Sequence, residues 1–286
     1  MTPGIPLTNI LSTLGQFAPL RLAEGWDNVG LLVGDRNSEI HRVMTCLTIT
    51  PDVVEEAVAS KADLIVAHHP LPFKPLAKLN TDSAASGMLW QLARAGVAVY
   101  SAHTAMDSAR QGINQMLAEA MSLDDIGVLD PAGESTGTSA STTVEGSGRF
   151  GKAGDVTMTQ ILHRLGECLG ANLFRCVVPP GKDANKPIKR VAVACGSGGS
   201  FLPLADRQGC DLMVTGEATF HTCLDAQNRG IGLVLLGHFH SERFAMERLA
   251  EFLAHEHDEI SVWASRCETD PIVEIAVKDG VNLSDR

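Results

Sequence analysis

Short apolar runs alternate with longer amphipathic stretches along most of this chain of 286 residues. Runs such as Leu64–Ala67 and Leu212–Thr215 have the length and composition of buried strands, whereas 84–95 and 157–169 carry apolar residues at helical spacing. Strands that alternate with helices of this length are typical of βαβ units. We therefore predict an α/β fold built on largely parallel sheets.

Polar side chains gather just after the carboxyl ends of these predicted strands. In open α/β sheets the ligand crevice lies at those ends, so four separate strand ends could contribute to one site. The residues concerned are His68 and His69 after 64–67, His103 and Asp107 after 97–102, Glu217 after 212–215, and His238 after 233–236.

The stretch from Gly237 to Glu242 follows one of these strands and opens an amphipathic helix. His238 and Glu242 are four residues apart, so they share a helix face. They cannot close a metal site alone, and the first half of the chain supplies three further candidates. The full set of candidate ligands is His68, His69, Asp107, His238 and Glu242.

Three imidazoles and two carboxylates suit a divalent ion such as Zn, Mn, Fe or Co better than Mg or Ca. Five ligands exceed the need of one tetrahedral ion, and a carboxylate that bridges two ions would use the surplus.

Each of these residues also has a simpler role open to it. A single histidine at a strand end can be a hydrogen-bonded turn residue, and adjacent His68 and His69 point opposite ways if the strand continues. Asp107 directly precedes a predicted helix from 108 to 121, where it could be the N-cap. Glu242 could be a first-turn carboxylate that the helix dipole favours. The residues alone leave these alternatives open.

A glycine-rich stretch, Gly196-Ser197-Gly198-Gly199-Ser200, precedes another predicted helix. Its backbone N–H groups could hold a phosphate. It lacks the Lys-Ser/Thr of a P-loop, so a tight turn is the favoured interpretation.

Composition limits the function classes. The formal net charge of −11 and the single tyrosine argue against a nucleic-acid-binding surface. The seven cysteines are odd in number and form no C-x-x-C pair, which is typical of a reduced, intracellular protein. No signal peptide and no apolar run of the roughly 20 residues that span a bilayer are evident. We expect a cytoplasmic protein without a membrane partner.

Five motifs occur together and in order, and this set resembles the Nif-three-like family (NGG-one-interacting factor three), also labelled GTP cyclohydrolase I type 2 homologues. The resemblance spans about residues 7–277. The motifs are Glu24-Gly25-Trp26-Asp27-Asn28-Val29-Gly30-Leu31, Ala67-His68-His69-Pro70-Leu71, Ser101-Ala102-His103-Thr104-Ala105-Met106-Asp107, Thr215-Gly216-Glu217 and Gly237-His238-Phe239-His240-Ser241-Glu242.

The resemblance implies two interleaved α/β domains with a metal site at their interface. Residues 1–127 and 236–286 would form the first domain. Residues 128–235 would form the second, which begins with a loop at 130–154 that is rich in Gly, Ser and Thr. Two divalent ions would be held by His68, His69, Asp107, His238 and Glu242, with Glu242 bridging. His103 would lie beside the centre, and the assembly would be a toroidal homohexamer.

The chain departs from the family's pattern at two histidines. His221 is single where relatives often show two in succession, and His240 is additional. The roles of both stay open.

Two functions compete at this stage. The first is a metal-dependent hydrolase that acts on a nucleotide-like or phosphorylated small molecule, with His103 or else His240 as proton relay. Gly196–Ser200 or Arg243 would supply donors for the substrate. The alternative is a non-enzymatic, oligomeric metal-binding scaffold that handles metal or regulates a partner. The cyclohydrolase label itself is a name carried by similarity.

Overall fold

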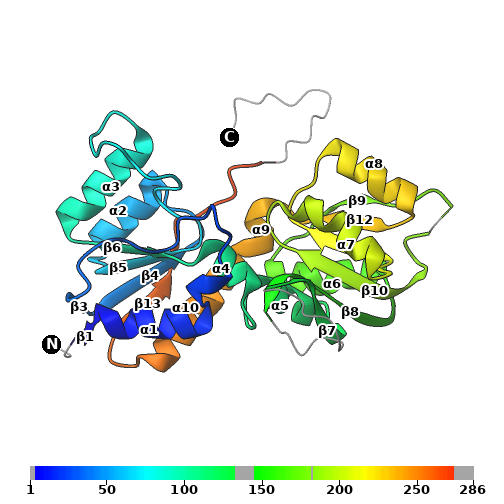
Figure 1. Cartoon of the computed structure of the whole chain (residues 1–286), viewed down its shortest axis with the longest axis horizontal. Helices are drawn as coiled ribbons and strands as arrows, with labels where there is room; N and C mark the ends of the chain where they lie inside the picture. The colour runs from blue at the N-terminus through cyan, green and yellow to red at the C-terminus, as the bar shows by residue number, and fades with distance from the viewer. Residues whose placement is uncertain (1–3, 133–144, 182, 274–286) are drawn as a thin grey trace, which may run out of the picture.

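Two sheets lie side by side along the long axis of the molecule in the computed structural model, which describes residues 4–132, 145–181 and 183–273 (Figure 1). The first sheet has five strands, of which the first four in spatial order are parallel neighbours and the last pairs antiparallel with β6. In spatial order its strands are β13 (Ser261–Ala264), β4 (Arg42–Cys46), β5 (Leu64–Ala67), β6 (Ala98–Ser101) and β2 (Gly30–Val33).

The second sheet has six strands and comes from a continuous part of the chain. Its centre, β10-β11-β12, is parallel, and the flanking strands are antiparallel. In spatial order the strands are β7 (Asp124–Pro131), β8 (Gly146–Thr157), β10 (Pro187–Ala194), β11 (Leu212–Thr215), β12 (Gly232–Leu235) and β9 (Arg175–Val177). Because β13 belongs to the first sheet, the chain returns there after it completes the second.

The remaining elements are helices and one short antiparallel pair, β1 (Ile5–Pro6) with β3 (Glu39–Ile40). The helices are α1 (Leu7–Phe17), α2 (Pro51–Ala59), α3 (Ala84–Ala95), α4 (His103–Ser108), α5 (Ile113–Ala120), α6 (Met158–Leu169), α7 (Leu202–Arg207), α8 (Phe220–Arg229), α9 (His238–Glu242) and α10 (Phe244–Glu256), with 3-10 turns η1 (Leu20–Leu22) and η2 (Gly198–Phe201). No helix within the described ranges is long and apolar enough to cross a membrane.

Local sequence explains where several helices begin and end. The Thr50 side chain accepts a hydrogen bond from the Val53 N–H, and Pro51 occupies the first turn of α2, where a missing N–H costs nothing. Thr157 and Gln160 form a capping box at the start of α6. The helix α3 ends at Gly96, whose left-handed conformation suits glycine.

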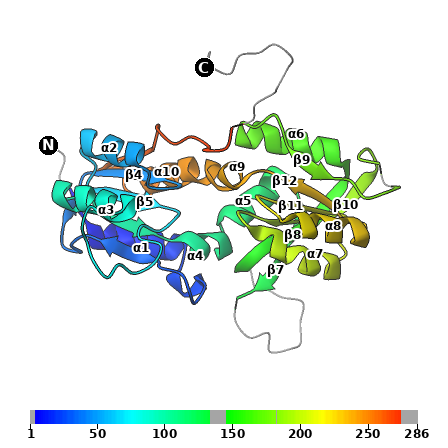
Figure 2. The same ribbon diagram turned by 90° about the horizontal axis from the view of Figure 1, so that it is seen from above.

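Side chains pack on both faces of each sheet. Successive residues of a strand point to opposite faces. In β5, Leu64 and Val66 join the largest cluster of buried side chains, whereas Ile65 packs with α2 and α3. Residues of α7 and α8 pack on one face of the second sheet. The largest cluster includes side chains of α1, α4, α5, α6 and α10 and of both sheets. Helices α4 and α9 lie between the two sheets (Figure 2).

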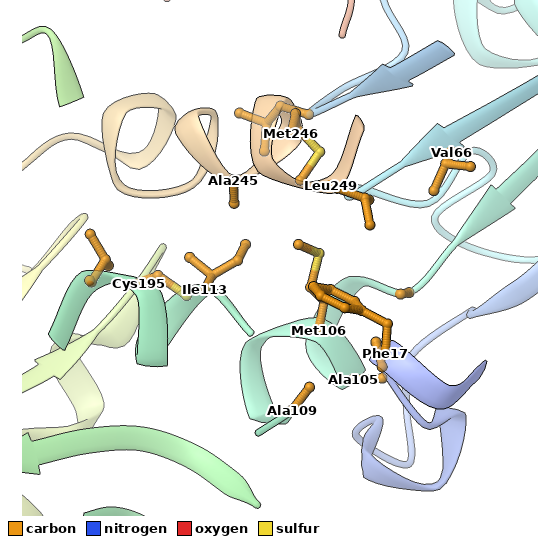
Figure 3. Packing of buried hydrophobic residues seen from close by; sticks show 14 of the residues in the cluster. Phe17, Val66, Ala105, Met106, Ala109, Ile113, Cys195, Ala245, Met246 and Leu249 are labelled. Atoms are coloured by element: carbon orange, nitrogen blue, oxygen red, sulfur yellow. The ribbon is translucent and has the colours of Figure 1, made fainter. Parts of the chain in front are cut away.

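Figure 3 shows the middle of this cluster, where Met106 of α4 lies among side chains from several elements. Ile113 from α5, Val66 from β5 and Leu249 from α10 belong to the same cluster. Apolar burial at roughly 25 cal/mol per Å² is the main stabilising contribution here, so α4 and α10 are held in place from both sheets.

Two predicted elements differ in the structure. The helix predicted from 108 to 121 is observed only from 113 to 120, as α5, because the preceding helix α4 ends at Ser108 and the chain turns near Gly112. At that glycine a Cβ would collide with the backbone of Met106, so the chain turns closely there. The predicted loop at 130–154 is wrong in its second part, because Gly146–Thr157 is the long strand β8. Residues 133–144 of that loop lie outside the described ranges.

The packing of β8 requires glycine at two of its positions. A Cβ at Gly148 would collide with the Leu129 side chain, and a Cβ at Gly151 would collide with the backbone of Asp124. Glycine therefore marks a close approach between strands here, not a flexible linker.

Candidate metal centre

Three strand ends from the two sheets deliver side chains to one place. The chain leaves β5 at His68, leaves β6 shortly before α4, and leaves β12 shortly before α9. Both α4 and α9 lie between the two sheets (Figures 1 and 2). The carboxyl ends of parallel strands from both sheets thus face the same region, as the crevice rule for α/β sheets leads one to expect.

The backbone after β5 turns both adjacent histidines toward this region. The His68 N–H donates to the Cys46 carbonyl at 2.9 Å and the His69 N–H to the Leu47 carbonyl at 2.8 Å. The carbonyl of His68 in turn accepts from the Ser101 hydroxyl at 2.6 Å. The two rings lie 5.1 Å apart between centroids, so the alternative in which they point to opposite sides does not hold.

The Glu242 carboxylate lies at the centre of the cluster. Its Oε2 atom is 3.1 Å from His69 Nε2, 3.2 Å from His238 Nε2 and 3.9 Å from His68 Nε2. Asp107 Oδ1 lies 3.6 Å from His68 Nε2. The structure therefore brings together all five residues that the sequence singled out as candidate ligands.

These side chains form three overlapping groups that could hold a metal ion, in each of which one ligand atom per residue lies within 4.8 Å of the others. The groups are His68, His69 and His103; His69, His238 and Glu242; and His68, Asp107 and Glu242.

His68 gives the sharpest test of whether these residues fit a cation. Its side chain is 1% exposed, and neither ring nitrogen has a hydrogen-bond partner among the described residues. Burial lowers the pKa of this imidazole well below its ordinary value, so the ring is neutral and carries a free lone pair. Buried polar atoms are nearly always partnered in native proteins, and a divalent cation would be a suitable partner.

In the absence of a cation, the pKa of Glu242 is lowered, whereas the pKa values of His238 and Asp107 are raised. Burial raises the pKa of Glu242, but hydrogen bonds from His238 and His69 outweigh it and hold this pKa well below its usual range. The hydrogen bond to Glu242 raises the pKa of His238 to about 9. Burial and the charge of Glu242 raise the pKa of Asp107 well above its ordinary value. A cation at this site would therefore displace protons.

Three of the four imidazoles have a polar neighbour at Nδ1. His69 Nδ1 lies 2.7 Å from the Thr48 hydroxyl, His103 Nδ1 lies 2.8 Å from Asp27 Oδ1, and His238 Nδ1 lies 3.5 Å from Glu217 Oε1. Outer partners of this kind set the tautomer and orientation of metal-binding histidines. The ring nitrogens Nε2 of His69 and His238 are then left to face Glu242.

His103 and Asp27 form a tight pair beside the cluster. The Asp27 side chain is fully buried, and burial raises its pKa, but hydrogen bonds from Thr104 and His103 outweigh burial and lower it. His103 has a positive φ of 33°, a conformation that non-glycine residues adopt rarely and often at functional sites. The His103 ring lies 5.2 Å from that of His68.

The turn after β10 closes the cluster from the second sheet. The Cys195 thiol donates to Asp107 Oδ1 at 3.2 Å, and burial raises the pKa of this thiol well above its ordinary value. Gly196 has a φ of 54°, and a Cβ there would collide with Glu242 Oε1. The Gly196 N–H donates to Ser241 Oγ at 3.0 Å. Only glycine leaves room for the carboxylate.

Sequence reasoning missed Asp27, Thr48 and Cys195 as partners of the cluster. Cys195 directly follows the end of β10 at Ala194, so the strand-end signal that found the histidines also applied to it. Thr48 likewise lies just after the end of β4, whereas Asp27 precedes β2 and reaches His103 only through a contact distant in sequence.

Several other predictions can be placed. Asp107 lies inside α4, so its alternative as a helix N-cap is wrong. His221 is exposed on α8, and His240 Nδ1 lies 3.4 Å from Asp270 Oδ2, away from Glu242. Arg243 pairs with Glu268 and Glu247 at 2.7 Å each, so its guanidinium faces the segment after β13 and is not the donor that we predicted for a substrate.

A cavity of about 580 Å³ opens onto the cluster, a size within the range of small-molecule sites. Its lining combines residues of the cluster, the glycine-rich turn and an aromatic group. The lining residues are Glu24, Trp26, His69, Phe73, His103, Thr104, Asp107, Ser108, Asn114, Ser147, Gly148, Ala194, Cys195, Gly196, Ser197, Gly198, Ser200, Phe201, His238 and Glu242.

Fold and site together define an α/β protein whose parallel strands end at a buried cluster of histidines and carboxylates. The family model for Duf34/NIF3 (NGG1p interacting factor 3) matches residues 5–271. The chain therefore belongs to the Duf34/NIF3 family, which confirms the resemblance noted in the sequence.

Curated relatives agree with this assignment. The chain is 31% identical over 245 residues to a Clostridium perfringens protein named GTP cyclohydrolase 1 type 2 homolog, covering 86% of this chain and 90% of the relative. It is 30% identical over 284 residues to Drosophila melanogaster NIF3-like protein 1, covering 98% and 93%. A solved hypothetical protein of Staphylococcus aureus superposes with a TM-score of 0.83 at 27% identity, covering 95% of this chain and 100% of that one.

Proposed function

We propose that the buried cluster is a dinuclear divalent-metal centre and that it serves a hydrolase acting on a nucleotide-like or phosphorylated small molecule. The single observation that carries the proposal is His68, a neutral and fully buried imidazole with no hydrogen-bond partner on either nitrogen within the described part of the chain. Such a group destabilises a fold by roughly 1–3 kcal/mol unless it gains a partner. A metal ligand is the partner that suits it.

The five proposed ligands divide naturally around Glu242, which is within 3.9 Å of three imidazoles. Glu242 would be shared between two ions, with His69 and His238 on one side and His68 and Asp107 on the other. The mixed nitrogen and oxygen set favours Zn, Mn, Fe or Co. The centre would lie between the two sheets and so between two interleaved domains, 1–127 with 236–286 and 128–235.

The residues around the centre support hydrolysis. Bound ions of this kind lower the pKa of a coordinated water and polarise an oxygen of the substrate. His103 is held at Nδ1 by Asp27, which suits it to hold or move a proton beside the cluster. The glycine-rich turn at 196–200 lines the same cavity and could present backbone N–H groups to a polar substrate group.

Metal content and turnover, measured on the same samples, test the proposal. We expect about two ions per chain after dialysis and metal-dependent hydrolysis in a screen of phosphoesters, nucleotides and cyclic amides. His68→Ala and Glu242→Ala should lose both properties. His163→Ala, an exposed histidine on α6, is the matched control and should keep both.

The outcomes separate the two functions considered. Hydrolytic activity that persists in both variants would contradict the proposed metal-dependent hydrolase. Tight metal binding without turnover on any substrate would instead favour the oligomeric metal-binding scaffold, which predicts a partner that binds only the metal-replete protein. A toroidal homohexamer is expected in either case and can be checked by mass measurement in solution.

A further inference from the structure

Two large aromatic side chains line the cavity but remain open to solvent. Trp26 is 62% exposed and Phe73 is 52% exposed, although both contribute to the wall of the cavity beside the cluster. Tryptophan and phenylalanine are among the residues that folding normally covers. Two such rings at the entrance of one cavity suggest a ligand-binding surface.

The aromatic pair is continuous with the buried cluster. The Trp26 and Phe73 rings lie 5.9 Å apart, and the His103 ring lies 6.0 Å from Trp26 and 6.1 Å from Phe73. His103 in turn lies 5.2 Å from His68. One small molecule could therefore contact the exposed rings with one part and reach the cluster with another.

Hydrogen bonds connect the segments that carry Trp26 and Phe73. Asn28, two residues after Trp26, donates through its side chain to the carbonyl of Pro72 at 2.8 Å. The turn that carries Trp26 is closed by a hydrogen bond from the Asp27 N–H to the Glu24 carbonyl at 2.9 Å. The Glu24 N–H donates to the hydroxyl oxygen of Thr104 at 3.0 Å, and Thr104 directly follows His103 in the chain. The surface is thus organised before a ligand arrives, which lowers the entropic cost of binding.

We propose that Trp26 and Phe73 bind a planar aromatic or heteroaromatic ring of the substrate, and that this ring positions the substrate's polar part at the cluster. The proposal rests on the proposed function for the identity of the reacting site. A ring is the occupant that the geometry favours, because two tilted aromatic rings line the same cavity of about 580 Å³ as the histidines and carboxylates of the cluster. Stacking on aromatic side chains contributes binding energy whatever the substituents of the ring.

Binding of adenosine and guanosine 5′-monophosphates, compared with ribose 5-phosphate, tests the inference on the full-length, metal-replete protein. We expect the nucleotides to bind at least roughly tenfold more tightly than ribose 5-phosphate, as one stacked base contributes. Calorimetry gives the affinities. Quenching of tryptophan fluorescence, from only three tryptophans, reports contact with Trp26.

Substitutions at the two aromatic residues distinguish a loss of ring stacking from a loss of folding. Trp26→Ala and Phe73→Ala should each weaken nucleotide binding roughly tenfold and leave ribose 5-phosphate binding unchanged. Trp26→Phe should restore most of the affinity but abolish the quenching. Trp90→Ala is the matched control, because Trp90 is also partly exposed, at 42%, but lies on α3 and does not line the cavity.

Three results would overturn the inference: equal affinity for nucleotides and ribose 5-phosphate, unchanged nucleotide affinity in Trp26→Ala, or no nucleotide binding at all. A Trp26→Ala variant that changes the mass of the assembly but not the affinity would show that a second copy covers this surface, which also overturns it. Metal content is measured in parallel and the titrations are repeated with chelator. A failure of the metal centre is therefore seen separately from a failure of ring binding.

Discussion

His68 and His69 are adjacent in the chain, yet their imidazoles have opposite surroundings. His69 is bonded at both nitrogens, to the Thr48 hydroxyl and to the Glu242 carboxylate. His68 is more deeply buried and has no hydrogen-bond partner within the described residues. One imidazole therefore contributes to the stability of the metal-free fold, whereas the other lowers that stability until a ligand reaches it.

The largest expected effect comes from Glu242→Gln, which alters the carboxylate that lies within 3.9 Å of both imidazoles. The amide has nearly the same size but lacks the negative charge, and its nitrogen cannot bind a cation. We expect metal affinity to fall by roughly 100-fold or more, measured by metal content after dialysis and by competition with a chelator. Glu251→Gln on the exposed face of α10 is the control. Equal metal content in the two variants would contradict the prediction.

The pH dependence of metal affinity is the next effect. In the metal-free protein the pKa of His238 is about 9, and that of Asp107 is also raised. Below these values a metal must displace the protons, so affinity should increase with pH, by roughly tenfold per unit for each proton displaced, and level off near pH 9. Chelator competition between pH 6.5 and 9.5 measures this. A flat profile, after correction for the chelator, would remove the support for proton displacement.

Leucine substitutions at the two neighbouring histidines sharpen the comparison. In metal-free protein, His68→Leu should raise the free energy of unfolding by about 1–2 kcal/mol because it removes unpartnered buried nitrogens. His69→Leu should lower it by a similar amount, since it removes two hydrogen bonds and leaves Glu242 with one fewer partner. Urea unfolding in the presence of a chelator gives both values. Changes of the same sign in the free energy of unfolding of the two variants would contradict the proposed difference between His68 and His69.

The smallest effect is expected for Thr48→Val, which keeps the side-chain shape but removes the hydroxyl at His69 Nδ1. Metal affinity should fall by less than roughly tenfold, because the ring loses only the partner that orients it. Thr13→Val is a close control, since Thr13 makes a similar 2.9 Å contact with His257 far from the cluster. An equal loss of affinity in both variants would show that Thr48 has no special role.

Local patterns predicted the parts of the fold that depend on neighbours in sequence. The bounds of α3 and β11 agree with the apolar patterns at 84–95 and 212–215. Position after a strand end found His68, His69, Asp107 and His238, and helical spacing from His238 found Glu242. The break at Gly112 and the strand β8 were missed. At Gly112 the close contact is with the backbone of Met106, and in β8 it is with residues of the neighbouring strand β7. The spacing of apolar residues records neither contact.

The partners of the cluster show the same limit. Thr48 and Asp27 touch His69 and His103 because turns of the first sheet come together, whereas Cys195 touches Asp107 because the two sheets meet. Their residue types alone are common in turns and cores. A position after the end of a strand predicts that a residue can reach the site. The packing of the surrounding turns determines which of its atoms make contact.

The return of the chain to its first sheet has a consequence for how the protein is made. On the ribosome, His68, His69 and Asp107 emerge more than a hundred residues before Glu242, which takes on the order of ten seconds at ordinary rates of synthesis. During that time β4 also lacks its neighbour β13, so one edge of the first sheet is open. During synthesis, three of the candidate ligands are therefore present well before Glu242, the carboxylate at the centre of the cluster, has been made.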